Sequence, residues 1–155
     1  MLSSLAQGAM ILNEPRYLSA AKNAAEFILK HLQDKEGRLL HRYRDGQASI
    51  KGMLEDYAFF IQGLLDLYEA GFEPKYLYSA KQLTEEMLKL FWDKEKGGLF
   101  FTAQDAEMLF VRQKEIFDGA YPSGNSIAAQ DLLRLGRLLM GKELEARAES
   151  LFKAF

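Results

Sequence analysis

The sequence predicts an all-α protein built from tandem α-helical hairpins, and three observations lead to this fold class. First, a segment of the sequence recurs at an offset of 59 residues, so that Glu14 returns as Glu73. Second, each copy holds one helical pattern that is apolar on one face and one that is apolar almost all round. Third, the links between these patterns are alternately short and long. Repeated helices of this kind bury their apolar faces against their neighbours.

The repeat is clearest at the start of each copy. Residues 14–22 recur as residues 73–81, and the triplet 34–36 (Asp-Lys-Glu) recurs as 93–95. A third, shorter copy is predicted to begin near Gly141. Ankyrin and tetratricopeptide arrays repeat at about 33–34 residues, so the longer period argues against both.

The first helix of each copy is expected to be half exposed. Residues 15–33 begin with Pro15, which suits the first turn of a helix. Apolar side chains at helical spacing form one face of this segment, namely Tyr17, Ala21, Ala24, Ile28 and Leu32. A charged stripe of Lys22, Glu26 and Lys30 lies opposite and recurs in the second copy. These features predict an outer helix with one wet face.

The second helix of each copy is expected to be buried on more than one side. Residues 54–70 carry apolar side chains around most of the helical circumference, and residues 122–140 are rich in leucine and small residues. A helix that is apolar nearly all round must be covered by neighbours on several faces. Alternation of half-exposed and buried helices predicts two concentric layers.

The long links are predicted to form the functional face. They span residues 34–51 and 93–121, and loops much longer than about 12 residues are usually functional or disordered. The first contains a strand-like segment at residues 39–43, and the second contains two such segments, 98–102 and 108–112, that predict a hairpin. Both links lead into the N-terminal ends of the inner helices, so we expect the site there.

Composition excludes several classes of function. Apolar residues make up 48% of the sequence, the net charge is −2, and cysteine is absent. No broad attraction to nucleic acid or to a membrane surface is expected, and no apolar run is long enough to cross a bilayer. The absence of cysteine and the presence of only two histidines predict no metal site and no cofactor, and favour a cytoplasmic protein.

Two motifs resemble a known family. Leu54-Glu-Asp-Tyr-Ala and Asp118-Gly-Ala-Tyr-Pro-Ser-Gly-Asn-Ser are similar to the C-terminal region of the spermatogenesis-associated, thioredoxin-domain-containing family. That family resembles N-acylglucosamine 2-epimerases and glycoside-processing enzymes, so the resemblance implies part of an (α/α)6 toroid with short strands or hairpins in its long loops.

The resemblance also suggests a division of the sequence into parts of that toroid. Residues 1–12 would be the tail of an inner helix, 13–70 and 72–140 two hairpin repeats, and 142–155 the outer helix of a truncated repeat. We therefore expect a fragment that lacks the thioredoxin-like domain, has little activity by itself, and forms a homo-oligomer through its open toroid ends.

Two carboxylates are the candidate catalytic residues. Asp56 lies in the first turn of one inner helix, and Asp118 precedes the next. Paired carboxylates can divide acid and base roles, as in glycoside hydrolysis. For Asp56 there is an alternative, because acidic residues favour helix N-termini, where they oppose the helix dipole.

The candidate ligand-binding residues surround these two carboxylates. They are Glu55, Tyr57, Tyr121, Ser123, Asn125 and Arg42. Ser123 has an alternative role as the cap of the following helix, and Gly124 would let a ligand or a neighbouring helix approach the backbone closely.

Two hypotheses for function follow. In the first, the toroid segment binds or processes a carbohydrate-like small molecule at the N-terminal ends of its inner helices. In the second, it is a non-catalytic helical scaffold that supports an attached thioredoxin-like redox domain.

Overall fold

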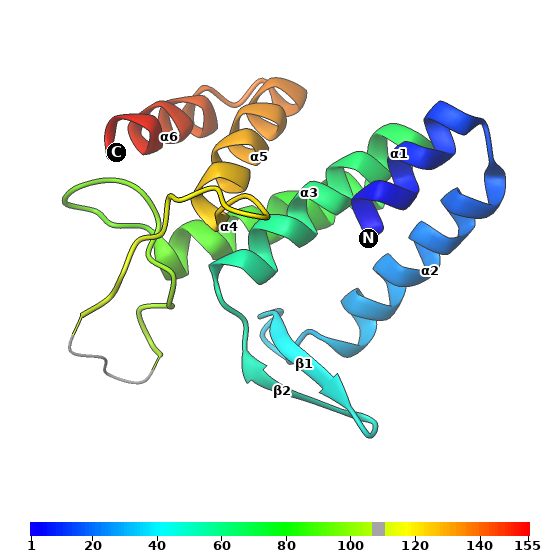
Figure 1. The fold of residues 1–155 in the computed structure, drawn as a ribbon, viewed down its shortest axis with the longest axis horizontal. Coiled ribbons are helices and arrows are strands. Elements are labelled where there is room, and N and C mark those ends of the chain that lie inside the picture. The colour runs from blue at the N-terminus through cyan, green and yellow to red at the C-terminus, as the bar shows by residue number, and fades with distance from the viewer. Residues whose placement is uncertain (107–110) are drawn as a thin grey trace. The chain divides into compact units, whose positions relative to one another are not determined.

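The computed structural model describes residues 1–106 and 111–155, which form a mostly helical structure with one two-stranded sheet (Figure 1). The helices are α1 (Leu2–Leu12), α2 (Pro15–His31), α3 (Leu54–Gly71), α4 (Pro74–Phe91), α5 (Gly124–Leu139) and α6 (Lys142–Lys153), and the strands are β1 (Leu40–Arg44) and β2 (Gln47–Lys51). The all-α class with a short hairpin in a long loop is confirmed. No helix in the described part of the chain is long and apolar enough to cross a membrane.

Burial separates two kinds of helix, as the apolar patterns predict. Helix α3 is buried over most of its circumference and carries many of the core side chains, among them Leu54, Tyr57, Ala58, Phe60, Ile61, Leu64, Leu65 and Leu67. Helix α2 buries only Ala21 and Ala25. The difference follows from composition, since the charged stripe of α2 stays in water while α3 has almost no charged residue beyond its first turn and Asp66.

The described residues divide into two compact units. The first comprises residues 1–52 and 60–83, and the second comprises residues 53–59 and 84–155. Helices α3 and α4 contribute to both units, so each unit holds one end of this antiparallel pair.

In the first unit, α1 and α2 run antiparallel and are joined by a tight turn (Figure 1). Asn13 ends α1 in the left-handed conformation (φ 50°), and its N–H donates to the carbonyl of Ala9. Asparagine tolerates this conformation better than most residues. Helix α1 also packs closely on α3, because a Cβ placed on Gly63 would lie 2.7 Å from Cδ2 of Leu2.

In the first unit, an ion pair and a hydrogen bond join helix α2 to helix α4 along a line of contact that we call the first seam. Lys75 Nζ lies 2.7 Å from Glu26 Oε1, and the hydroxyl of Tyr76 donates to the same carboxylate oxygen at 3.2 Å. The ring of Tyr76 is fully buried between the two helices, and the ion pair of Lys75 with Glu26 lies at the surface.

The long loop of the first unit forms a β-hairpin. The strand predicted at residues 39–43 is confirmed as β1, and it pairs antiparallel with β2, which the sequence analysis did not identify. Asp45 and Gly46 connect the strands with φ angles of 52° and 78°. Two consecutive positive φ angles in an Asp-Gly pair are typical of a type I′ turn.

In the second unit, α5 and α6 form a tight antiparallel hairpin. Met140 adopts the left-handed conformation, and Gly141 N–H donates to the carbonyl of Gly136 at 2.8 Å. The core of this unit includes the edge-to-face contact of Tyr57 with Phe91, whose ring centroids are 5.4 Å apart.

The hairpin predicted in the second long loop differs from the structure. Residues 98–102 form no strand, and Leu99 makes only an isolated bridge with Trp92. Residues 108–110 of the second predicted arm lie outside the described residues. One backbone bond, from Phe101 N to Gln113 O at 2.8 Å, joins the two sides of the loop. Side chains also bind backbone groups of this loop: Asn125 of α5 binds Leu99 and Glu115, and Arg112 and Lys114 donate to the carbonyls of Thr102 and Gly97, respectively.

The approach of α1 to α3 gives a test of the packing in the first unit. Gly63→Ala should destabilise the protein by about 1–3 kcal/mol, because the added methyl overlaps Leu2. The matched change Gly8→Ala should instead stabilise by about 0.5–1 kcal/mol, since a Cβ on Gly8 meets nothing closer than 3.4 Å. Chemical denaturation measures both. Equal effects of the two substitutions, or no relief of Gly63→Ala by Leu2→Ala, would contradict this packing.

Candidate functional site

The candidate site is built on the N-terminus of α5. Ser123 is the N-cap residue of this helix, and its Oγ accepts a hydrogen bond from the N–H of Ser126 at 3.2 Å. The capping role considered for Ser123 is therefore confirmed. Ser123 is buried, so its hydroxyl serves the helix rather than the surface.

Asp118 binds the same helix end from the preceding loop. Its Oδ1 accepts from the N–H of Ser123 and from the hydroxyl of Ser126, both at 2.8 Å. These two bonds, the backbone one first, hold the pKa of Asp118 below its ordinary value. Asp118 is exposed, so an ionised carboxylate is presented at the surface.

Glu55 reaches the α5 N-terminus from the first turn of α3. A Cβ placed on Gly124 would lie 3.3 Å from Cγ of Glu55 and 2.9 Å from Cγ of Leu54. Glycine at 124 thus allows a neighbouring helix to approach, which was one of the two expected uses of this residue. Partial burial raises the pKa of Glu55, and the negative charges of Glu115 and Asp56 raise it further.

Asn125 holds the loop against α5. Its Oδ1 accepts from Leu99 N–H, and its Nδ2 donates to the carbonyls of Leu99 and Glu115, each at 2.9 Å. The side chain is almost fully buried. Ligand binding by Asn125 stays a prediction, but its amide already serves backbone groups that would otherwise lack partners. It places Glu115 near the site.

Asp56 and Tyr57 are turned toward the protein. Asp56 Oδ2 accepts from Met53 N–H at 2.8 Å, as an acidic residue does when it caps the start of its own helix. Tyr57 is fully buried against Phe91. Catalysis by Asp56 and ligand binding by Tyr57 stay predictions, and the geometry favours positional roles for both.

Two further predicted residues lie at the surface. Tyr121 is 62% exposed, two residues before the N-cap of α5. Arg42 lies on β1 in the first unit, where its Nη2 donates to Ser49 Oγ at 3.3 Å. Their ligand-binding roles also stay predictions.

The structure adds two residues that the sequence analysis did not single out. Glu115 raises the pKa of Glu55 by its charge, and Ser126 binds Asp118 through its hydroxyl. Ser126 could have been found from its place three residues after the cap Ser123, in the first turn of α5. Glu115 carries no local signal, because its backbone is held at the helix end by a bond from Asn125, ten residues further along the sequence.

Two carboxylates whose pKa values are shifted in opposite directions approach the N-terminus of α5. Glu55 has a raised pKa and Asp118 a lowered one. Carboxylates whose environments move their pKa values apart can take acid and base roles, respectively. Among the described residues, no three His, Cys, Asp or Glu side chains are grouped so as to hold a metal ion.

This helical arrangement is that of the α/α toroid enzymes. A D-mannose isomerase matches 99% of this chain with a TM-score of 0.82 and 21% identity, over 40% of its own chain. The cellobiose 2-epimerase of Spirochaeta thermophila matches 97% of this chain with a TM-score of 0.77, and a family 76 glycoside hydrolase (mannosidase) of Bacteroides thetaiotaomicron matches 99% with 0.79. These likenesses, at 15–21% identity, establish the fold.

The sequence itself is similar to spermatogenesis-associated protein 20. The human protein is 38% identical over this whole chain, and an uncharacterized protein of Caenorhabditis elegans is 34% identical over 98% of it. The chain spans about a fifth of the length of these relatives, 21% and 22% respectively. The resemblance inferred from the two helix-start motifs is thereby confirmed. No family model matches the sequence.

The pKa of Glu55 provides a direct test of the site. We expect its carboxyl to titrate above the ordinary glutamate range, and Glu115→Gln to lower that pKa while leaving the burial effect in place. Because the folded pKa is raised, ionisation of Glu55 reduces stability as the pH rises through this range. Carbon-detected NMR of the carboxyl group measures the titration. The matched change Glu145→Gln on α6 should leave it unaltered; an ordinary pKa for Glu55 would refute this electrostatic description.

Proposed function

We propose that this toroid segment binds a carbohydrate-like molecule at the N-terminal ends of α3 and α5 and supports proton transfer there. The observation that carries the proposal is the pair of carboxylates with opposite pKa shifts, Glu55 and Asp118, at one helix end. The fold neighbours named for mannose, cellobiose and mannoside chemistry support the ligand class. Fold analogy alone does not determine a reaction, so the argument rests on the residues.

Each residue has a role that follows from its surroundings. Glu55 would act as the acid, because a carboxyl with a raised pKa keeps its proton to a higher pH and can donate it to a sugar oxygen. Asp118 would remain ionised and accept a hydrogen bond from a sugar hydroxyl through its exposed oxygen. Tyr121, exposed beside this carboxylate in sequence, would cover the apolar face of the sugar. Asp56 remains a second candidate acid beside Glu55.

The alternative is a non-catalytic scaffold for an attached thioredoxin-like redox domain. One observation favours it, namely that Asp56, Asp118 and Asn125 all bind backbone groups of the protein itself. In that case these residues serve only to shape the loop, and the site has no ligand.

Saccharide binding and turnover distinguish these functions. D-mannose, cellobiose and 4-nitrophenyl α-D-mannopyranoside serve as probes, with binding measured by NMR and turnover by sugar analysis. We expect Glu55→Gln to lower turnover about 100-fold or more with little loss of binding, and Asp118→Asn to weaken binding roughly tenfold. Glu145→Gln on α6 is the matched control. Neither binding nor turnover in the unaltered protein, with intact folding, would support the scaffold and exclude the carbohydrate function.

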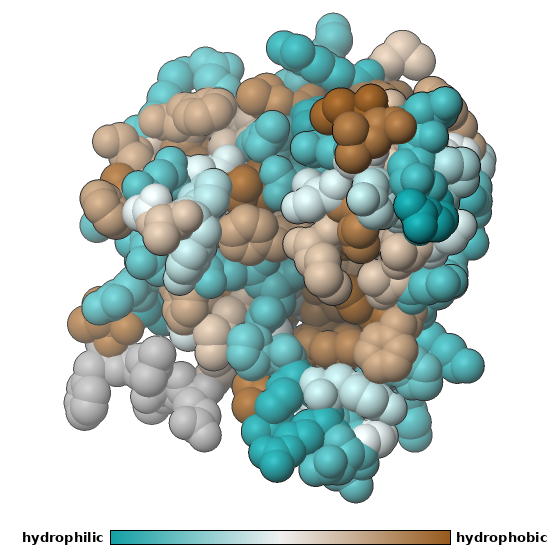
Figure 2. All heavy atoms as spheres, turned by 45° about the vertical axis from the view of Figure 1, so that its right-hand side comes forward, coloured by the Kyte–Doolittle hydropathy of each residue, from teal (hydrophilic) through white to brown (hydrophobic). Residues whose placement is uncertain are grey.

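We further propose that the protein self-associates through apolar side chains that remain in water. Ile11 at the end of α1 is 79% exposed and Met140 after α5 is 90% exposed, and Figure 2 shows apolar surface among hydrophilic residues on one face. Exposed apolar surface of this kind commonly marks an interface. A second copy of this chain is the proposed occupant, since Ile11 in the first unit and Met140 in the second can each bury against the same side chain of another copy.

The oligomeric state tests this proposal. Light scattering at tens of micromolar, a concentration at which weak homo-oligomers persist, should give a mass above that of one 17.7 kDa chain. Ile11→Glu together with Met140→Glu should return the protein to a monomer, because a charge buried in the interface is costly. Tyr78→Glu, at an exposed position on α4, is the control. A monodisperse monomer for the unaltered protein would contradict self-association.

A further inference from the structure

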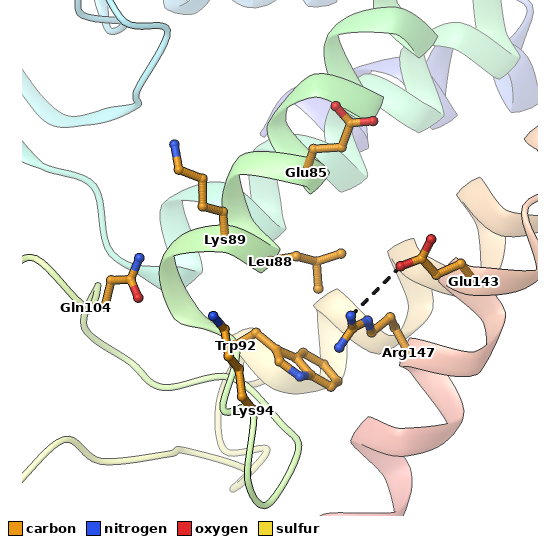
Figure 3. A pocket seen from close by; sticks show the side chains of 8 residues that line it. All are labelled: Glu85, Leu88, Lys89, Trp92, Lys94, Gln104, Glu143 and Arg147. Carbon is orange, nitrogen blue, oxygen red and sulfur yellow. Dashed lines mark ion pairs between the residues drawn. The ribbon is translucent and has the colours of Figure 1, made fainter.

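A cleft of about 590 Å³ lies between α4 and α6 in the second unit (Figure 3). Leu88 and Trp92 form its apolar floor, and the two helices form its sides. It shares no residue with the site at the N-terminus of α5. The charged and polar side chains that line it are Glu85, Lys89, Lys94, Gln104, Glu143 and Arg147.

The repeat explains why the cleft is open. Ala80 and Leu83 are buried in α4, and Ala148 and Leu151 are buried in α6 at an offset of 68 residues. At this offset, the contact line between α4 and α6, which we call the second seam, corresponds to the first seam between α2 and α4. In the first seam, Lys75 and Tyr76 bind Glu26.

At the second seam the closing residues are replaced. Glu143 stands where the first seam has Lys75, and Leu144 stands where it has Tyr76, while Glu85 repeats Glu26. Two glutamates cannot form an ion pair with each other, and leucine has no hydroxyl to bridge them. The second seam therefore stays open above Trp92.

Arg147 reaches over the floor without a strong ion pair. Its Cζ lies 5.0 Å from the ring centroid of Trp92, and its Nη2 lies 3.9 Å from Glu143 Oε1, at the outer limit for a salt bridge. Glu143 is 85% exposed, so this pair is weak and exchanges readily with water or a ligand. Stacking on the indole orients the guanidinium across the cleft (Figure 3).

The mixed lining indicates the class of ligand. An anion would be repelled by Glu85 and Glu143, and a cation by Lys89, Lys94 and Arg147. A neutral polyhydroxyl ring meets neither penalty, because each hydroxyl can donate to a carboxylate and accept from a guanidinium or an ammonium. Its C–H face matches an apolar floor that includes an indole. Gln104 adds both a donor and an acceptor at the edge.

We propose that the cleft between α4 and α6 is a second, surface site that binds a neutral saccharide over Trp92. The proposal stands independently of the function assigned to Glu55 and Asp118, since it rests on different residues and involves binding without reaction. An open cleft with solvent-exposed charged groups implies a dissociation constant in the millimolar range.

Trp92 is the sole tryptophan of the chain, so its fluorescence reports on ligands that bind beside this side chain. Trp92 also borders a second hollow with Phe100 and Arg112, so the variants below assign the response to the cleft. D-mannose, D-glucose and cellobiose are the neutral probes, and sodium glucuronate and glucosamine hydrochloride are the charged comparators. We expect a saturable change in Trp92 emission with at least one neutral sugar below about 100 mM, and a weaker response to both charged ones. No saturable change with any neutral sugar, or tighter binding of a charged comparator, would overturn the proposal.

The repeat supplies a variant that closes the cleft. Glu143→Lys recreates at the second seam the lysine that pairs with Glu26 at the first, so it should attract Glu85 and abolish the saccharide response. Glu145→Lys carries the same charge change on the same turn of α6 but does not line the cleft, and it should bind as the unaltered protein does. Equal responses of the two variants would also overturn the proposal. Loss of turnover in Glu55→Gln should leave the Trp92 response intact, which separates the two sites.

Discussion

The buried amide of Asn125 is the interaction on which the candidate site depends. A loop of some thirty residues between α4 and α5 forms no strand ladder in its described part, so its backbone groups need other partners. Asn125 provides partners on both sides of the loop. Its side-chain oxygen accepts from the N–H of Leu99, and its side-chain NH2 donates to the backbone carbonyls of Leu99 and Glu115. These bonds hold both sides of the loop, including the segment next to Asp118, against the start of α5.

Close approach of two helix starts is the second constraint. Gly124 lacks a side chain, so Leu54 and Glu55 of α3 pack directly on the first turn of α5. The contact partly buries Glu55, which raises its pKa, while hydrogen bonds from the N–H of Ser123 and the hydroxyl of Ser126 lower the pKa of Asp118. One local geometry therefore produces opposite electrostatic effects on two carboxylates, so that Glu55 keeps its proton to a higher pH while Asp118 stays ionised.

Repetition of the hairpin conserves the fold but not its surface chemistry. The buried positions recur from α4 to α6, as Ala80 and Ala148 illustrate, because each of these helices buries one apolar face. The surface residues beside these buried positions differ between the two seams. The first seam has an ion pair at Lys75, and the second has an open cleft at Glu143. Loops and seams, rather than helices, thus distinguish one copy of the repeat from the next.

The sequence by itself determined the helices and their alternating burial, because these follow from apolar periodicity and from starts such as Pro15 and Pro74. The toroid class came from the family resemblance of the motifs at residues 54–58 and 118–126. The sequence also predicts a site at the helix starts, where Glu55, Asp56 and Asp118 lie. Only the tertiary structure decided which carboxylate has a raised pKa and which accepts from a backbone N–H, since Glu55 and Asp56 are adjacent acidic residues in the sequence. Their difference arises from Gly124, Glu115 and Met53, two of which are distant along the chain and reach them only through folding.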